Sequence, residues 1–266
     1  MMLANKEIIF KDIKAKHGDF KIITFDMYIS RYLEKYGEWA EQECDLYKKM
    51  LNKQCIVVEV GSHIGSHTIP LANIASYVIT YEPQRLIYQT LCHNLIKNNV
   101  TNVCAYMMAV GKENKDIQLN EIDYKFYINN NKETNTGGAE IKKLLSDTGY
   151  KIPMVTLDNH LHHLQSLHFL KIDAEFMELD ILKGATQLIN KFKPVLYFEF
   201  DLKVNKDLFE YVTSLDYIMY YHITEMFNPD NHNKDKEDLH PHSTSNMIFA
   251  VHKSLQFKTN LERVQC

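Results

Sequence analysis

The sequence predicts an α/β fold built on a doubly wound, mostly parallel sheet. Short apolar runs, each long enough for one buried strand, follow one another along the chain, and helical patterns separate most of them. Parallel βαβ units produce this alternation. Two further apolar runs near the C-terminus, Tyr217–Tyr221 and Met247–His252, predict an antiparallel closing pair at the edge of the sheet.

The N-terminal part, residues 1–50, is expected to form a helical cap. Residues 1–29 have the pattern of short strands or an irregular segment, whereas residues 30–51 have that of an amphipathic helix. Gly37 is expected to interrupt this helix.

The main domain is expected to span residues 51–254, followed by a tail over residues 255–266. Its predicted core strands are Cys55–Val60, Tyr77–Glu82, Val103–Met108, Phe169–Ile172 and Val195–Phe200. Its predicted helices are about 66–75, 84–98 and 175–192.

Residues 112–156 interrupt the alternation with a polar stretch, for which we expect an antiparallel excursion and a loop. The pair Gly137-Gly138 within it has two readings: a hairpin turn, or a point where the backbone closely approaches an active site. The sequence leaves both open.

Composition limits the partners. The chain has 266 residues and a formal net charge of −4, which gives no basic surface for a polyanion, so nucleic acid is not favoured. Its five cysteines form no C-x-x-C pair and are expected to be reduced. With neither a signal-peptide pattern nor an apolar run near ~20 residues, we expect a cytoplasmic protein without a membrane span. Nothing indicates the oligomeric state.

The first core strand breaks at a glycine and enters a helix. Gly61 and Gly65 let the backbone turn tightly and approach a ligand. Glu82, 21 residues after Gly61, ends the next strand, where an acid accepts hydrogen bonds from ribose hydroxyls. These features predict a site for a nucleoside cofactor.

The spacing of the turn distinguishes between cofactors. Dinucleotide folds use G-x-G-x-x-G, whereas here the spacing is G-x-x-x-G and Glu59 precedes the turn. A carboxylate there would repel a pyrophosphate but suits the ammonium and sulfonium groups of S-adenosylmethionine (SAM). SAM is therefore favoured, with NAD(P) and an ordinary turn without a cofactor as the alternatives.

The candidate cofactor-binding residues lie on this turn and the neighbouring strand ends: Glu59, Gly61, Ser62, His63, Gly65, His67, Thr68, Glu82, Pro83 and Ala109. We expect the two histidines to contact the methionine part of SAM or to cap the turn, rather than to act as a base.

A second group of acids follows the later strands. Ligands of open parallel sheets bind beyond the carboxyl ends of the strands, so Asp173, Glu175 and Glu199 should face the same crevice as Gly61. An acid after an apolar strand is costly unless it has a partner or a task. Glu178 lies one helical turn beyond Glu175, where it can also simply complement the helix dipole.

Four blocks in this order carry a resemblance to a known family. They are Tyr36–Trp39, Val58–Gly65, Tyr81–Pro83 with Leu91–Asn94 and Asn98, and Leu170–Glu178 with Gly184. On these motifs the sequence resembles the FkbM family of SAM-dependent methyltransferases. The resemblance implies a Rossmann-like class I methyltransferase fold, SAM as donor, and methylation of a hydroxyl, often on a sugar or a polyketide-type product.

The chain departs from the family pattern at specific positions. The usual D-x-G-A-N-x-G has Glu59 for Asp, Ser62 for Ala and His63 for Asn, which keeps the acid and the glycines. In the usual D-x-E-G-x-E, Phe176 stands where Gly is common. This change bears on the local backbone and on the shape of the acceptor pocket.

Methyl transfer to an alcohol needs a general base and a well-positioned acceptor. Asp173 and Glu175 are the leading candidates for the base, and Glu199 for orienting a sugar hydroxyl. The candidate acceptor-binding residues are Tyr36, Glu38, Trp39, Gly137, Gly138 and Glu178. The carboxylates could also hold Mg²⁺, which is not favoured, and the histidines between residues 160 and 168 match no metal template.

Other functions remain as alternatives. Amino-methylating enzymes of nucleic acids commonly carry a D/N-P-P-Y/F motif, and the nearest sequence, Asn228-Pro229-Asp230, begins a charged loop for which a lid role is open. A non-catalytic SAM-binding module is a second alternative. An NAD-dependent oxidoreductase acting on sugars is a third, which Glu59 disfavours.

Overall fold

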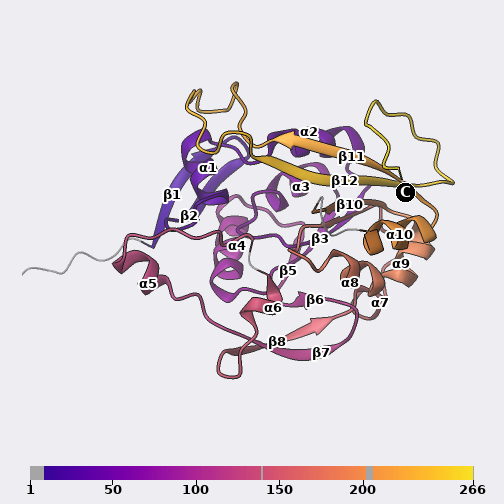
Figure 1. The fold of residues 1–266 in the computed structure, drawn as a ribbon, viewed down its shortest axis with the longest axis horizontal. Coiled ribbons are helices and arrows are strands. Elements are labelled where there is room, and N and C mark those ends of the chain that lie inside the picture. Colours follow the sequence, from indigo (N-terminus) through magenta and orange to yellow (C-terminus); the bar gives the residue numbers. More distant parts are fainter. Residues whose placement is uncertain (1–8, 139, 202–205, 266) are drawn as a thin grey trace, which may run out of the picture.

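The computed structural model describes residues 9–138, 140–201 and 206–265. Over these residues the main sheet has seven strands in the order β11-β12-β10-β9-β3-β4-β5 (Figure 1). The strands are β3 (Ile56–Val60), β4 (Tyr77–Tyr81), β5 (Val103–Tyr106), β9 (Phe169–Ile172), β10 (Val195–Glu199), β11 (Tyr217–Glu225) and β12 (Thr244–His252). Neighbours from β10 to β5 pair in parallel, and β12 pairs antiparallel with β10 and β11. The predicted sheet with its antiparallel closing strand is confirmed.

Helices cover both faces of this sheet. One face carries α7 (Leu157–His160), α8 (Glu178–Lys183), α9 (Thr186–Phe192) and α10 (Lys206–Ser214), packed on inward-facing side chains such as Leu170 and Phe198. The other carries α2 (Glu41–Met50) and α3 (Thr68–Ile74), packed on Val57 and Phe169. Because apolar side chains on both faces of the central strands are buried, these strands read as continuous apolar runs.

Several expected elements differ in extent. Both C-terminal strands are longer than expected, because β11 continues to Glu225 and β12 begins at Thr244. The strand expected to reach Met108 ends at Tyr106. The single helix expected over residues 175–192 is two helices, α8 and α9, separated at Gly184 and Ala185. A Cβ at Gly184 would lie 2.1 Å from the carbonyl oxygen of Gly111, so only glycine permits the approach of these two segments.

The N-terminal segment joins a β-hairpin to two helices. β1 (Phe10–Ala15) and β2 (Gly18–Ile23) pair antiparallel, and α1 (Ile29–Tyr36) and α2 follow. Gly37 ends α1 in a left-handed conformation, φ 70°, at the expected interruption. Asn94 lies in α4 (Arg85–Lys97), and Asn98 directly follows this helix. The side chains of both residues donate hydrogen bonds to the backbone of β2 and accept hydrogen bonds from it, which fixes the hairpin to the main domain.

The polar insertion forms a small second sheet with the order β6-β8-β7, below the main sheet in Figure 1. It comprises β6 (Ala109–Val110), β7 (Lys115–Leu119) and β8 (Tyr150–Val155), and the antiparallel β7–β8 pair confirms the expected excursion. The segment between β7 and β8 contains α5 (Tyr124–Asn129) and α6 (Ile141–Leu144). It crosses to the N-terminal segment, where residue 134 pairs with the backbone of Phe25 and Met27.

The C-terminal segment after β12 runs back along β11, where Val264 donates its backbone N–H to Met219. Within the described ranges, no helix has the length and apolar character needed to cross a membrane.

The ends of β3 and β9 approach each other closely. Gly61 follows β3 with φ +85°, and a Cβ there would lie 1.8 Å from the carbonyl oxygen of Asp173. The contact is with backbone, which cannot move aside as a flexible side chain can. Gly61 is therefore required both by its φ and by the space available.

We expect Gly61→Ala to lower the free energy of unfolding by more than about 2 kcal/mol, because positive φ and overpacking act together. Denaturant unfolding measures the loss. Gly111→Ala is the control, because its added methyl would meet chiefly the flexible side chain of Met154. Equal losses in the two variants would contradict this account.

Candidate functional site

The carboxyl ends of four parallel strands open into one cavity of about 320 Å³. Gly61, Glu82, Asp173 and Glu199, from the ends of β3, β4, β9 and β10, all line it. The remaining wall comes from the N-terminal segment, the turns after β3 and β9, the insertion and the β11–β12 segment: Tyr28, Ile29, Trp39, Glu43, His63, Asn135, Gly137, Gly138, Glu175, Met226, Ser243, Thr244, Ser245 and Met247.

A second, narrower cavity adjoins the first. The two share Gly61, Glu82, Gly137, Asp173 and Glu175 as lining residues. The rest of the second wall is mainly apolar and includes Pro83, Met108, Ala109, Ile141 and Met177. The pair of cavities thus joins a narrow apolar compartment to a wider, acidic one.

Glu82 lies between the two cavities. Its carboxyl oxygens accept backbone hydrogen bonds from His63 at 3.0 Å and from Gln84 at 2.9 Å. Burial outweighs these bonds and raises the pKa of Glu82 to about 7. The group is held rigidly at the strand end where an acid was expected to meet a ribose.

Glu59 lies beneath the turn and lines neither cavity. Its Oε2 accepts hydrogen bonds from Thr68 at 2.6 Å and Thr80 at 3.1 Å, and its Oε1 has no partner among the described residues. Burial raises its pKa. The sequence argument that this carboxylate repels a pyrophosphate directly therefore has no support in the geometry, and Thr68 acts as its partner.

Of the remaining turn residues, only His63 lines the larger cavity. It takes a left-handed φ of 48°, and its Nε2 pairs with Thr136 at 2.8 Å, whereas its buried Nδ1 has no partner among the described residues. Burial lowers its pKa. Ser62, Gly65 and His67 lie behind the wall, with Ser62 bonded to the carbonyl of Tyr81.

Asp173 has a buried cationic partner that sequence reasoning missed. Lys171, in the middle of β9 and 1% exposed, donates to Asp173 Oδ2 at 2.7 Å. Burial opposes its charge, but Asp173, Glu59 and Glu43 raise the pKa of Lys171 above its usual range. The burial of Lys171 depends on acids from other elements that surround it. The sequence of the strand alone does not show these neighbours.

The pKa values of the other acids near Asp173 lie above that of an ordinary glutamate. Burial, followed by the charge of Asp173, raises the pKa of Glu175 and that of Glu199. Burial also raises the pKa of Glu178, to about 8. Glu178 lies beside this group but not on either cavity wall.

Glu43 of α2 is a further acid on the wall that sequence reasoning missed. It is 2% exposed, and its carboxyl accepts hydrogen bonds from Ser245 of β12 at 2.6 Å and from Tyr47 at 3.0 Å. In the sequence it reads as an ordinary acid in the first helical turn. Only the packing of α2 against the sheet brings it to the site.

The candidate acceptor residues divide into two sets. Trp39, Gly137 and Gly138 line the larger cavity, and the glycine pair lies outside any hairpin turn. A close approach of this backbone to an active site stays a prediction. Tyr36 and Glu38 are buried away from both cavities. Tyr36 bonds the backbone of residues 237 and 239.

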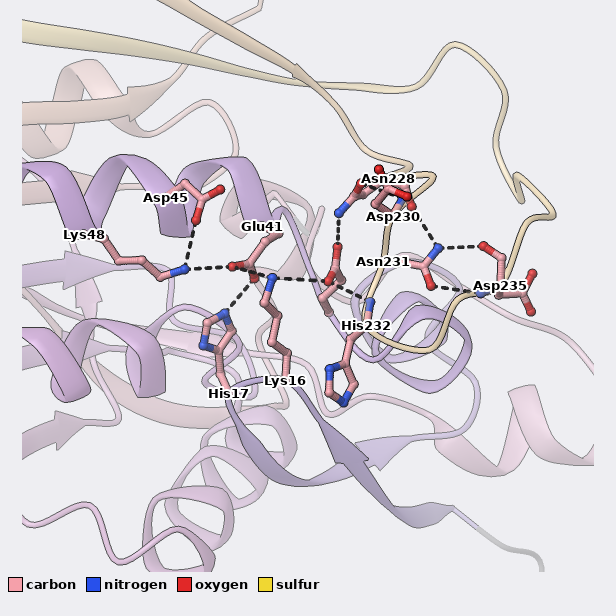
Figure 2. Close-up of polar contacts among 11 residues, drawn as sticks. Lys16, His17, Glu41, Asp45, Lys48, Asn228, Asp230, Asn231, His232 and Asp235 are labelled. Carbon is pink, nitrogen blue, oxygen red and sulfur yellow. Dashed lines mark hydrogen bonds and ion pairs between the residues drawn. The ribbon is translucent and has the colours of Figure 1, made fainter.

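Glu38 anchors the loop between β11 and β12 (Figure 2). Its carboxylate accepts hydrogen bonds from Asn228 at 2.7 Å and from the backbone of His232 at 3.0 Å, and Lys16 lies 3.7 Å away. Met226 and Ser243 at the two ends of this loop line the cavity. Glu38 therefore supports the part of the cavity wall that Met226 and Ser243 form.

One group of described side chains has the spacing of a metal site: donor atoms of His17, Glu41 and Cys44 lie within 4.8 Å of one another. Glu41 is already engaged, because His17 at 2.7 Å, Lys16 at 3.0 Å and Lys48 at 3.0 Å surround it (Figure 2). Burial raises the pKa of the Cys44 thiol well above its usual range. Two lysines and a protonated thiol do not make a cation site.

Comparison with known proteins identifies the family. The methyltransferase FkbM domain matches residues 59–219, more than half of the chain. The chain belongs to the FkbM methyltransferase family. The curated protein "Methyltransferase 1" of Beauveria bassiana (strain ARSEF 2860) is 25% identical over 142 residues, which cover 48% of this chain and 57% of that relative. The chain thus spans little more than half the length of this relative.

A solved structure with a TM-score of 0.50 supports the fold. The precorrin-6y C5,15-methyltransferase from Geobacter metallireducens GS-15 superposes with a TM-score of 0.50 at 11% identity, over 80% of this chain and 88% of that one. The methyltransferase FkbM from Methylobacillus flagellatus KT matches with a TM-score of 0.46 at 20% identity, over 74% of this chain and 44% of that one. The predicted class I methyltransferase fold is confirmed.

The ion pairs of Glu41 predict an acid-sensitive contribution to stability. Burial opposes its ionisation, but His17, Lys16 and Lys48 outweigh burial and lower the pKa of Glu41 to about 2. Since an unfolded glutamate titrates near 4.5, this contribution is present above that pH and is lost as pH falls towards 2.

Glu41→Gln should therefore be less stable than the parent at pH 7, and the gap should close between about pH 5 and pH 2. Urea unfolding across this range measures it. Glu225→Gln, at an exposed position, is the control. A gap that stays constant down to pH 2 would show that the ion pairs contribute nothing.

Proposed function

We propose that the protein is a SAM-dependent O-methyltransferase that methylates a hydroxyl group of a sugar or glycan. Membership of the FkbM family is the observation that carries the proposal. The cavity at the carboxyl ends of β3, β4, β9 and β10 supports it, because ligands of doubly wound sheets bind there.

The residues present fit the proposed cofactor. The apolar second cavity, with Pro83, Met108 and Ala109, suits an adenine ring, and Glu82 at its boundary suits the ribose hydroxyls. The buried, unpartnered Nδ1 of His63 offers a polar contact on the wall of the larger cavity. SAM supplies an electrophilic methyl group on a sulfonium.

The acids divide the remaining tasks. The ion pair with Lys171 fixes the position of the Asp173 carboxyl group, with Lys171 Nζ 2.7 Å from Asp173 Oδ2, which suits orientation of the acceptor. Glu175, whose pKa burial and Asp173 raise, is the better matched proton acceptor at neutral pH. Glu199 and Trp39 on the same wall suit a hydroxyl and the C–H face of a sugar.

Composition and geometry also bear on the location of the protein, on the class of acceptor and on the need for a metal. The described cysteines are all free, as expected for a cytoplasmic protein. No lysine or arginine lines the described cavity wall, which disfavours nucleic acid as acceptor. The carboxylates on the wall do not converge as a trio of cation ligands, so Mg²⁺ is not favoured.

The direct test incubates the purified protein with labelled SAM and a panel of free glycans, nucleotide sugars and a structured RNA. Label transferred to a glycan hydroxyl supports the proposal. Transfer to RNA alone would refute it, and SAM binding without any transfer would favour the non-catalytic alternative.

Glu82→Gln should weaken SAM binding by about 1.5–3 kcal/mol, because charge-assisted hydrogen bonds to ribose are lost. In the parent, binding favours the ionised carboxylate, so the affinity should increase as pH rises through the raised pKa of about 7. Calorimetry at pH 6, 7 and 8 measures both effects. An unchanged dissociation constant in the variant would show that Glu82 does not reach the ribose.

Asp173→Asn should lower turnover by roughly 10²-fold or more while changing SAM affinity much less. Glu175→Gln serves as the comparison, and if Glu175 is the base its loss in turnover should be at least as large. EDTA should leave the parent active. Normal turnover in the Asp173 variant would remove this residue from the mechanism, and loss of activity with EDTA that Mg²⁺ restores would require a metal.

A further inference from the structure

The ionisable side chains on the wall of the larger cavity are mainly acidic. Glu43, Glu82, Asp173, Glu175 and Glu199 line it, and no lysine or arginine does so among the described residues. They come from different elements, α2 and the ends of β4, β9 and β10. These carboxyl groups therefore come together only when the chain folds.

These acids differ in what the protein provides for them. Glu82 and Glu43 accept hydrogen bonds, and Asp173 has Lys171. Over the described part of the chain, Glu175 and Glu199 receive no hydrogen bond and form no ion pair. A partly buried carboxylate without a partner is costly, so these two are available to a ligand group that is positive or donates hydrogen bonds.

Among the described residues, the acids that act on these two carboxyl groups outnumber the cations. Near α6, Glu140 and Lys143 face Glu175 and pair with each other. In the described part of the chain the buried ammonium group is that of Lys171, which is shared among Asp173, Glu59 and Glu43.

The positions of these carboxyl groups determine which part of a bound ligand they contact. Asp173 and Glu175 belong to both cavities, whereas Glu199 and Glu43 belong to the larger one alone. With the nucleoside in the narrow cavity and ribose at Glu82, the rest of the cofactor must extend into the acidic cavity. The part of SAM that differs from its product S-adenosylhomocysteine (SAH) is the positive sulfonium.

We infer that this cavity distinguishes the two forms of the cofactor by charge, and binds SAM more tightly than the neutral thioether SAH. The inference rests on the proposed function. Attraction between a cation and carboxylates inside a cavity is stronger than in water, because less solvent screens it. Once the methyl group and the positive charge leave, the acids no longer favour the ligand, so the site itself promotes product release.

Calorimetry with the full chain at pH 8 tests this inference with three ligands: SAM, SAH and sinefungin, which carries an amine in place of the methylsulfonium. SAM and sinefungin should each bind at least tenfold more tightly than SAH. Glu175→Gln and Glu199→Gln should each reduce this ratio, whereas the exposed control Glu225→Gln should not.

SAH binding as tightly as SAM, or more tightly, would overturn the inference while leaving the proposed cofactor in place. Binding of none of the three ligands would overturn both. A ratio that survives in both variants would also count against it, since the discrimination would then not come from the acids named here.

Discussion

One buried ammonium group holds the centre of this molecule together. Lys171 lies in the middle of β9, opposite Glu59 of β3 in register, and pairs with Asp173 two residues on. Glu43 brings the charge of α2 to the same centre. Removing the cation would leave the buried Glu43 and Glu59 and the partly exposed Asp173 without it, a larger cost than the loss of one exposed ion pair. The fold of the central sheet and the arrangement of the site therefore depend on one interaction.

The features that could be predicted from the sequence are those set by local patterns. Continuous apolar runs identified the central strands, and the acids that end them, Glu82, Asp173 and Glu199, meet at one edge because parallel strands place their carboxyl ends together. Glu43 and Lys171 could not be found this way, because only long-range packing buries them. The orientation of Glu59 was also beyond reach, since a strand pattern does not say which face meets a ligand.

Two of the four departures from the family pattern fall on unusual backbone. His63, where the family usually has Asn, has φ 48°, and Phe176, where Gly is common, has φ 61°. Asn and Gly tolerate this left-handed region better than other residues do. The backbone shape is thus kept in spite of the substitutions, and some strain is retained at the edge of the site. The half-exposed Phe176 ring has no buried packing to offset it.

Glu38 anchors the β11–β12 loop and so joins two regions of the cavity wall that lie far apart in the sequence. Two sets of cavity-lining residues lie outside the matched stretch of residues 59–219: Trp39 and Glu43 in the N-terminal segment, and Met226 and Ser245 near the ends of the β11–β12 loop. Glu38 ties these two outlying regions to each other. Substitutions in the two regions are therefore coupled through one contact, and the wall that they form can change shape without any change in the matched stretch.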